Sequence, residues 1–255
     1  MPSAFDATAA TFDRYRSLPA GVPEAIRVAI WDTLRPFNLS RVLEIGAGTG
    51  RIGKAFVTAG DHYVGIDISL AMLQQFACNC AGCFLAQADG RQLPFRDGAF
   101  DIVLLMQVLG GVGDWLSIVS ESRRVLRTGG SVIVGHTISP EQGVDAQLKR
   151  RLAAILEEMG VSCHRPQKAR RQALAWLESS AARNVCTQAA LWNVITTPQE
   201  FLARHRTGAR FAALPRIAQE QALMQLMSFA IATFGSLDAG FQEERSFHLD
   251  MFEFP

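Results

Sequence analysis

The chain has 255 residues, of which 49% are apolar and 19% charged, and its formal net charge is +1. This length and composition predict one large globular domain, or a core domain with a lid, with enough apolar side chains for a buried core. A net charge near zero provides no general attraction to nucleic acid or to an anionic membrane, so neither is expected as a partner.

The sequence predicts a cytoplasmic protein without a targeting or membrane-spanning segment. Residues 1–16 lack an apolar core of signal-peptide length, and no run approaches the roughly 18 apolar residues of a membrane span. Five cysteines, an odd number, fit reduced thiols better than a disulfide framework. Cys78, Cys80 and Cys83 lack a matching second pair of ligands, so no metal is expected.

A helix is predicted from Pro23 to about Leu34, because proline suits a first helical position and Ile26 and Ile30 are spaced to face a core. The segment from Arg41 to Arg51 follows, in which an aliphatic run indicates a buried parallel strand. That run passes into glycines, which permit positive φ and let a ligand lie against bare backbone. The helix after them, predicted over Arg51 to Ala59, would point free N–H groups at that ligand. The three glycines are Gly46, Gly48 and Gly50.

The second strand, Tyr63 to Ile66, leads to Asp67, 21 residues beyond Gly46. A carboxylate at the tip of a second parallel strand is suited to bind the hydroxyls of a ribose. A nicotinamide dinucleotide fingerprint would need glycine at the position of Arg51, so the Glu-x-Gly-x-Gly-x-Gly spacing argues against an NAD(P)-dependent oxidoreductase.

Further parallel strands are predicted after a helix that Ser69 caps. Their carboxyl ends bring Asp89, Gln107 and His136 to one edge of the sheet, which is where ligands bind in folds of this class. A turn at Arg127 to Gly130 is expected before the last of them. These strands are Phe84 to Ala88, Phe100 to Met106 and Ser131 to Gly135.

Four segments in this order resemble the successive motifs of class I S-adenosylmethionine-dependent methyltransferases of the small-molecule type, similar to the methyltransferase domain of ubiquinone and menaquinone biosynthesis. They are Val42 to Arg51, Val64 to Ser69, Ala88 to Phe95 and Arg124 to Gly135. The resemblance implies S-adenosylmethionine as the cofactor. It also implies that Asp6 to Arg16 form a short helix that folds over the cofactor, although an ordinary surface helix would have the same sequence pattern.

The resemblance further implies which residues contact the cofactor. The ribose would be held by Asp67, the adenine amine by Asp89, and the adenine ring by Ile68 and Met72. An Asx turn is the structural alternative for Asp89. The implied contacts are Tyr15, Arg16, Glu44, Gly46, Ala47, Gly48, Gly50, Asp67, Ile68, Met72, Ala88, Asp89, Gly90 and Gln107.

Beyond Ser139 the pattern changes to long helices. We expect one domain over residues 1–255, with the cofactor-binding core at 36–136 and helical cap or lid insertions at 139–182 and 198–240. Strand six is predicted at Val185 to Ile195, and Ser246 to Phe254 is expected as an edge strand antiparallel to it. The predicted fold is therefore α/β, a doubly wound, Rossmann-like, seven-stranded sheet whose last strand is antiparallel, with helical lid insertions.

The resulting functional expectation is methyl transfer from S-adenosylmethionine to oxygen, nitrogen or carbon of a small molecule bound under the lid. His136 is the imidazole that the sequence places at the catalytic edge, where it could act as a general base. A turn contact before Pro140 is the alternative role for His136. Gly110 and Gly111 supply no side chain in the loop after strand four, so a catalytically silent, S-adenosylmethionine-binding interaction protein remains an alternative. The oligomeric state is left open.

Overall fold

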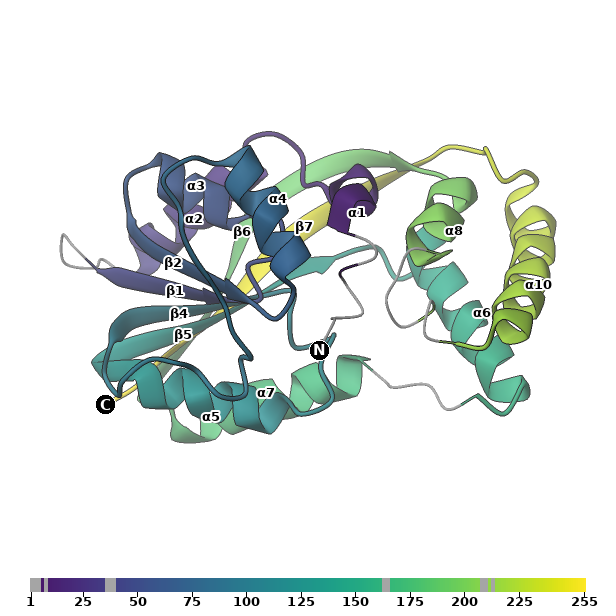
Figure 1. The fold of residues 1–255 in the computed structure, drawn as a ribbon. Helices are drawn as coiled ribbons and strands as arrows, with labels where there is room; N and C mark the ends of the chain where they lie inside the picture. Colours follow the sequence, from purple (N-terminus) through teal and green to yellow (C-terminus); the bar gives the residue numbers. More distant parts are fainter. Residues whose placement is uncertain (1–5, 7–8, 35–39, 162–165, 207–210, 212–213) are drawn as a thin grey trace.

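The computed structural model describes residues 6, 9–34, 40–161, 166–206, 211 and 214–255 (Figure 1). Helices and strands alternate over the first half of the chain, and long helices dominate the second half until the last strand. The elements are α1 (Ala9–Arg16), α2 (Val22–Leu34), β1 (Arg41–Ile45), α3 (Gly53–Thr58), β2 (His62–Asp67), α4 (Leu70–Asn79), β3 (Phe84–Gln87), β4 (Phe100–Met106), α5 (Trp115–Val125), β5 (Leu126–Ile138), α6 (Val144–Glu158), α7 (Pro166–Ser180), β6 (Arg183–Thr196), α8 (Pro198–Arg206), α10 (Arg216–Phe234) and β7 (Phe241–Glu253).

The strands form a seven-stranded sheet in the order β3-β2-β1-β4-β5-β7-β6. The first five strands are parallel, and β7 runs antiparallel to both of its neighbours. The predicted fold class is confirmed, including the antiparallel last strand. The expectation that Ser246 to Phe254 would form an edge strand is wrong, because β7 lies between β5 and β6 and the edge is β6.

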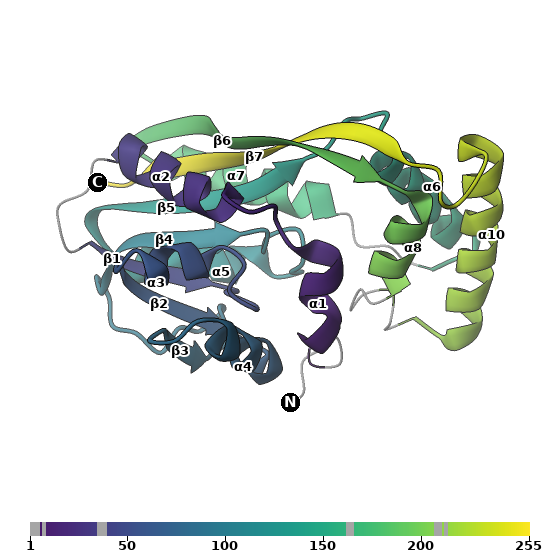
Figure 2. The same ribbon diagram turned by 90° about the horizontal axis from the view of Figure 1, so that it is seen from above.

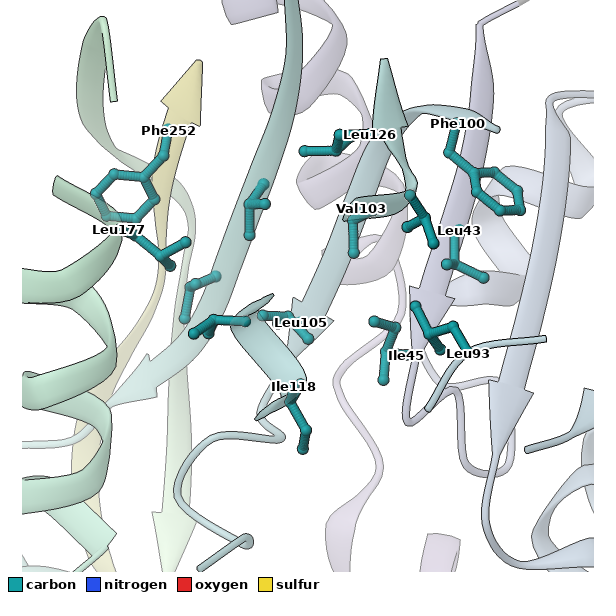
Figure 3. Packing of buried hydrophobic residues seen from close by; sticks show 14 of the residues in the cluster. Leu43, Ile45, Leu93, Phe100, Val103, Leu105, Ile118, Leu126, Leu177 and Phe252 are labelled. Carbon is teal, nitrogen blue, oxygen red and sulfur yellow. The ribbon is translucent and has the colours of Figure 1, made fainter. Parts of the chain in front are cut away.

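Helices cover both faces of this sheet. The face toward α2, α3 and α4 buries Phe56 and Phe76, and the face toward α5 and α7 buries Leu105 and Leu177. Figure 3 shows the second of these cores, in which side chains of β1, β4 and β5 meet those of the covering helices. Because both faces are covered, β4 is buried along its whole length, and its predicted bounds match the structure.

Local signals at the ends of helices are also observed. Ser69 accepts a hydrogen bond from the Met72 backbone N–H at 3.2 Å, as an N-cap should. Thr197 and Glu200 exchange reciprocal hydrogen bonds of 3.1 and 3.3 Å, which form a capping box at the start of α8.

The turn expected at Arg127 to Gly130 is instead part of β5, where an irregular register between β4 and β5 accommodates the two glycines.

A second cluster of helices forms a cap at one end of the sheet. Helices α6, α8 and α10 pack on one another through a separate apolar core that includes Leu148, Phe201 and Leu226. Helix α7 is not part of this cap, because Ala173 and Leu177 pack on the sheet beside α5 (Figure 1). The insertion predicted at 139–182 is therefore divided between the cap and the cover of the sheet.

The cap is connected to the sheet by a two-stranded extension of β6 and β7. Strand β5 pairs with β7 as far as Ile138 opposite Ser246, whereas β6 and β7 continue together from Trp192 opposite Arg245 to Thr196 opposite Phe241. Figure 2 shows these strands reaching beyond the sheet toward α8 and α10. We call the five residue pairs of this extension the β6–β7 arm.

Candidate functional site

The glycine loop between β1 and α3 has one position that faces open space. All three glycines have positive φ, which favours glycine. A Cβ atom on Gly46 would lie 2.5 Å from Val108, and one on Gly50 would lie 2.3 Å from the Phe76 ring. At Gly48 the nearest such atom is the Gly46 carbonyl oxygen at 4.0 Å. Two of the glycines are therefore required by packing, and the backbone of Gly48 is the part of the loop that a ligand can approach.

Asp67 lies at the end of β2 beside this loop. Its carboxylate accepts hydrogen bonds of 2.9 Å from the backbone N–H groups of Gly48 and Ser69. Burial raises the pKa of Asp67, and these backbone bonds oppose that shift. Each carboxylate oxygen has further lone pairs, so Asp67 can hold the loop and still accept from two hydroxyl groups.

Glu44 lies beneath the loop rather than on it. The residue is 2% exposed and accepts a 2.5 Å hydrogen bond from the hydroxyl of Tyr63. Burial raises the pKa of Glu44 to about 7, although Tyr63 and Arg51 act in the opposite direction. Gly53 makes room for this pair, because a Cβ there would lie 2.2 Å from the Tyr63 oxygen. This placement favours support of the loop from below over contact with a ligand.

The residues expected to surround an adenine differ in their exposure. Ile68 is 45% exposed, whereas Met72 is 2% exposed and lies in the interior. Asp89 accepts from the backbone and guanidinium of Arg91, which lowers its pKa and forms the Asx turn named as its structural alternative. Gly90 packs close to Ile45. Ile68 and the partly exposed Asp89 remain able to meet a base.

Gln107 follows β4 with a φ of +60°, the only positive φ at a non-glycine residue in the described part of the chain. Its amide joins two neighbours, because Oε1 accepts from Arg51 at 2.9 Å and Nε2 donates to Thr137 Oγ1 at 2.8 Å. Strained backbone held by its surroundings is frequent at functional sites. Because β1 pairs in parallel with both β2 and β4, Gln107 lies at the same carboxyl edge as Gly48 and Asp67, as predicted.

Helix α1 is bound to the glycine loop by polar contacts. Thr49 donates to Asp13 at 2.5 Å, and Ser69 donates to Asp6 at 2.5 Å. Arg51 donates to the carbonyl of Arg16. The helix thus covers the glycine loop, and its contact with a cofactor stays a prediction. The side chain of Tyr15 lies outside the described part of the structure.

Arg51 is a site residue that the sequence argument used only to exclude a dinucleotide fingerprint. Its guanidinium carbon lies 5.1 Å from the centre of the Phe12 ring, and that of Arg16 lies 4.8 Å from the same ring. Arg16 also donates to the backbone oxygen of Arg204 at 2.8 Å. Its pKa is lowered to about 10, by burial first and then by Arg204 and Arg51. The guanidinium groups of Arg16 and Arg51 both lie over the Phe12 ring and therefore create positive potential beside the loop.

His136 lies on the opposite side of the sheet from this group. Consecutive strand residues point to opposite faces, and Thr137 is the residue that contacts Gln107. The Nδ1 atom of His136 is 3.7 Å from Asp250 Oδ2, and the ring centre is 6.0 Å from that of His248. Burial, followed by Arg170 and His248, lowers the pKa of His136 to about 4. The imidazole is therefore neutral at pH 7.

Residues 43–134 match a family described as a methyltransferase domain. A demethylmenaquinone methyltransferase of Clavibacter sepedonicus is 30% identical over 154 residues, which cover 57% of this chain and 63% of that protein. One of Parafrankia sp. (strain EAN1pec) is 34% identical over 151 residues, covering 51% and 59%. The matched region thus spans less than two thirds of each of these relatives.

Solved structures share the fold at low sequence identity. The YcgJ protein of Bacillus subtilis superimposes with a TM-score of 0.56 at 19% identity, covering 89% of this chain and 97% of YcgJ. Phosphoethanolamine N-methyltransferase 2 of Haemonchus contortus gives 0.54 at 15% identity, covering 98% of this chain and 57% of that one. The fold, which includes the glycine loop and Asp67, is similar to that of Rossmann-like methyltransferase structures. The match over residues 43–134 makes this segment similar to known methyltransferase domains.

Proposed function

We propose that this protein transfers the methyl group of S-adenosylmethionine to a small-molecule acceptor. The observation that carries the proposal is the open backbone of Gly48 next to the carboxylate of Asp67. A nucleoside needs a flat approach to backbone and an acceptor for its ribose hydroxyls, and these two residues supply both. The matched family and the named activities of the relatives support the same reaction.

The roles of the protein groups follow from their positions. Asp67 binds the ribose hydroxyls, Ile68 and Asp89 meet the adenine, and Arg51 and Arg16 attract the carboxylate of the methionine end. When bound, S-adenosylmethionine supplies an electrophilic methyl group on a sulfonium. Because the reaction is a displacement, the protein mainly has to align the two reactants and exclude water.

We further propose His136 as the base that takes a proton from the acceptor. The imidazole is neutral at pH 7, which is the form that can accept a proton, but its lowered pKa of about 4 makes it a weak base. His136 also lies on the opposite side of the sheet from the group around Gln107, so we expect substrate positioning to contribute more than the base. The contribution of a base depends on whether oxygen, nitrogen or carbon is methylated.

The cap of α6, α8 and α10 forms the acceptor side of the proposed site. Its helix α8 contacts α1 through Arg16, so the cap is coupled to the helix that covers the loop. Among the described residues no helix is long and apolar enough to cross a membrane. A cytoplasmic location is part of the proposal, supported by free thiols at Cys78, Cys80, Cys83 and Cys186.

Calorimetric titration with S-adenosylhomocysteine tests the cofactor role. Asp67→Ala should weaken binding by about 1.5–3 kcal/mol, or roughly one to two decades in Kd, because a charged acceptor is lost. Asp32→Ala, at an exposed position of α2, is the matched control and should bind like the parent. Equal dissociation constants for the two variants would remove Asp67 from the site.

Limited proteolysis tests the role of the cap as a lid. If the segment from Phe201 to Phe234 closes over the acceptor, S-adenosylhomocysteine should slow its cleavage through the contact between Arg16 and α8. Cleavage at the same rate with and without the ligand would show that this segment is a static part of the core.

A further inference from the structure

Four cationic side chains converge where α1, α6, α8 and β7 meet. Arg16 donates to the backbone of Arg204, and Arg204 lies 2.6 Å from Asp145 Oδ1. Arg245 approaches Asp145 Oδ2 at 3.6 Å. Lys149 lies one turn after Asp145 on α6 and interacts electrostatically with these groups. We call Arg16, Lys149, Arg204 and Arg245 the cation cluster.

The two carboxylates in this region already have donors. Asp145 is held by Arg204 and Arg245. Glu243 accepts from the backbone N–H of Val144 at 2.6 Å and pairs with Arg245 at 3.0 Å. Lys149 has no carboxylate oxygen within 4.0 Å in the described part of the chain. Four positive charges therefore face two negative charges.

Two donors in the cluster have places for an additional acceptor. The Nε atom of Arg245 is buried and has no hydrogen-bond partner among the described residues. A buried donor without a partner costs free energy that an incoming acceptor would recover. The Lys149 side chain is exposed, so its ammonium group can reach solvent and a ligand.

The electrostatic potential around the cation cluster is positive, in agreement with the count of four positive and two negative charges. Desolvation of the Lys149 ammonium in this crowded region lowers its pKa; Asp145 opposes that shift, and Arg204 and Arg245 add to it. The pKa of His205 is lowered to about 4, by burial and then by Arg204. Positive potential of this kind attracts an anion.

We propose that the cation cluster binds an anionic group, a carboxylate or a phosphate, on the methyl acceptor. This assignment rests on the proposed methyl transfer. The position of Arg16 supports the assignment. Its guanidinium donates to Arg204 in the cluster, and its carbonyl accepts from Arg51 in the cofactor loop. An acceptor held by its anionic end at Lys149 and Arg245 would lie between the cap and the loop.

The experiment uses the full chain loaded with S-adenosylhomocysteine and two probes, inorganic phosphate and acetate. Binding is measured by broadening of the phosphate ³¹P signal and by saturation transfer to the acetate methyl group. Lys149→Gln should weaken binding of at least one probe by about tenfold or more, because a charge-assisted contact is lost. Lys149→Arg keeps the charge and should restore most of it. Lys168→Gln, at an exposed position of α7, is the control.

Comparison of the probes tells carboxylate from phosphate as the preferred group. Equal probe binding by the Lys149→Gln and Lys168→Gln variants, or no binding to the parent, would overturn the proposal and assign the cluster to the packing of the cap. Calorimetry with S-adenosylhomocysteine on the same samples separates this result from failure of the proposed function. If the cofactor product does not bind but phosphate binds through Lys149, methyl transfer is wrong and the anion site stands.

A second arm uses tritiated S-adenosylmethionine with a metabolite extract divided by anion exchange. The labelled product should arise from the retained, anionic fraction, and its yield at limiting acceptor should fall in Lys149→Gln. Labelling confined to the unretained fraction would contradict an anionic acceptor.

Discussion

Replacing Glu44 by glutamine should make the stability of this protein less sensitive to pH. Glu44 is buried and bonded to Tyr63, and its pKa is raised from 4.5 to about 7. The folded protein therefore binds the Glu44 proton more tightly than the unfolded chain does. Stability contributed by that proton is fully present below pH 4.5 and is lost as the pH rises through about 7.

The size of the effect follows from the same two values. A pKa difference of one unit corresponds to about 1.4 kcal/mol, so the change from 4.5 to about 7 corresponds to about 3 kcal/mol of unfolding free energy. Glutamine does not titrate and can still accept from the Tyr63 hydroxyl. The free energy of unfolding of Glu44→Gln, relative to the parent, should thus rise by about 3 kcal/mol between pH 4.5 and pH 8.

Urea unfolding followed by circular dichroism at several pH values measures this difference, since titration of all other groups cancels between parent and variant. Glu157→Gln on the exposed side of α6 is the matched control and should show no such trend. A constant difference between the parent and Glu44→Gln over this range would refute the assignment of a raised pKa to Glu44 and the account of the Tyr63 contact.

Two further predictions concern the loop and the proposed base. Gly48→Val should abolish binding of S-adenosylhomocysteine while circular dichroism shows an intact fold. Gly50→Ala should mainly lower stability, by about 1–3 kcal/mol, because its Cβ meets the Phe76 ring. Normal binding by the Gly48 variant would show that the backbone of Gly48 is not part of the site. His136→Asn should slow turnover by roughly 10² to 10⁴ at saturating cofactor if His136 is a general base, and a rate within a few-fold of the parent would leave the reaction to positioning.

The cofactor-side half of the fold could be predicted from sequence because its signals are local. A continuous apolar run predicted the bounds of β4, and Ser69 marked a helix start through a side chain that bonds its own backbone. Asp67 was predicted because it closes the second strand, 21 residues beyond Gly46 of the glycine loop. The patterns for β4 and Ser69 lie within a few residues of the features that they predict, and the pattern for Asp67 lies within one strand–helix–strand unit.

The parts that were missed depend on contacts distant in sequence. Arg51 meets Phe12 and Gln107, and nothing near Arg51 in the chain indicates either partner. The amphipathic pattern of α7 fits a cap as well as a sheet, and only the pairing of Leu177 with the sheet core decides between them. The position of β7 inside the sheet is likewise set by partners on β5 and β6 rather than by its own alternation.

The β6–β7 arm holds the cap at a distance from the body of the sheet. Five residue pairs extend past the last contact of β7 with β5, a reach of roughly 16 Å at about 3.3 Å per residue. Over that reach, a bend of about 6° at the base of the arm displaces its far end by nearly 2 Å. A small bend at the base therefore produces a larger movement at the cap. Because the pairing of β5 with β7 ends before the arm begins, a change in the length of the cap does not require a change in the register of β5.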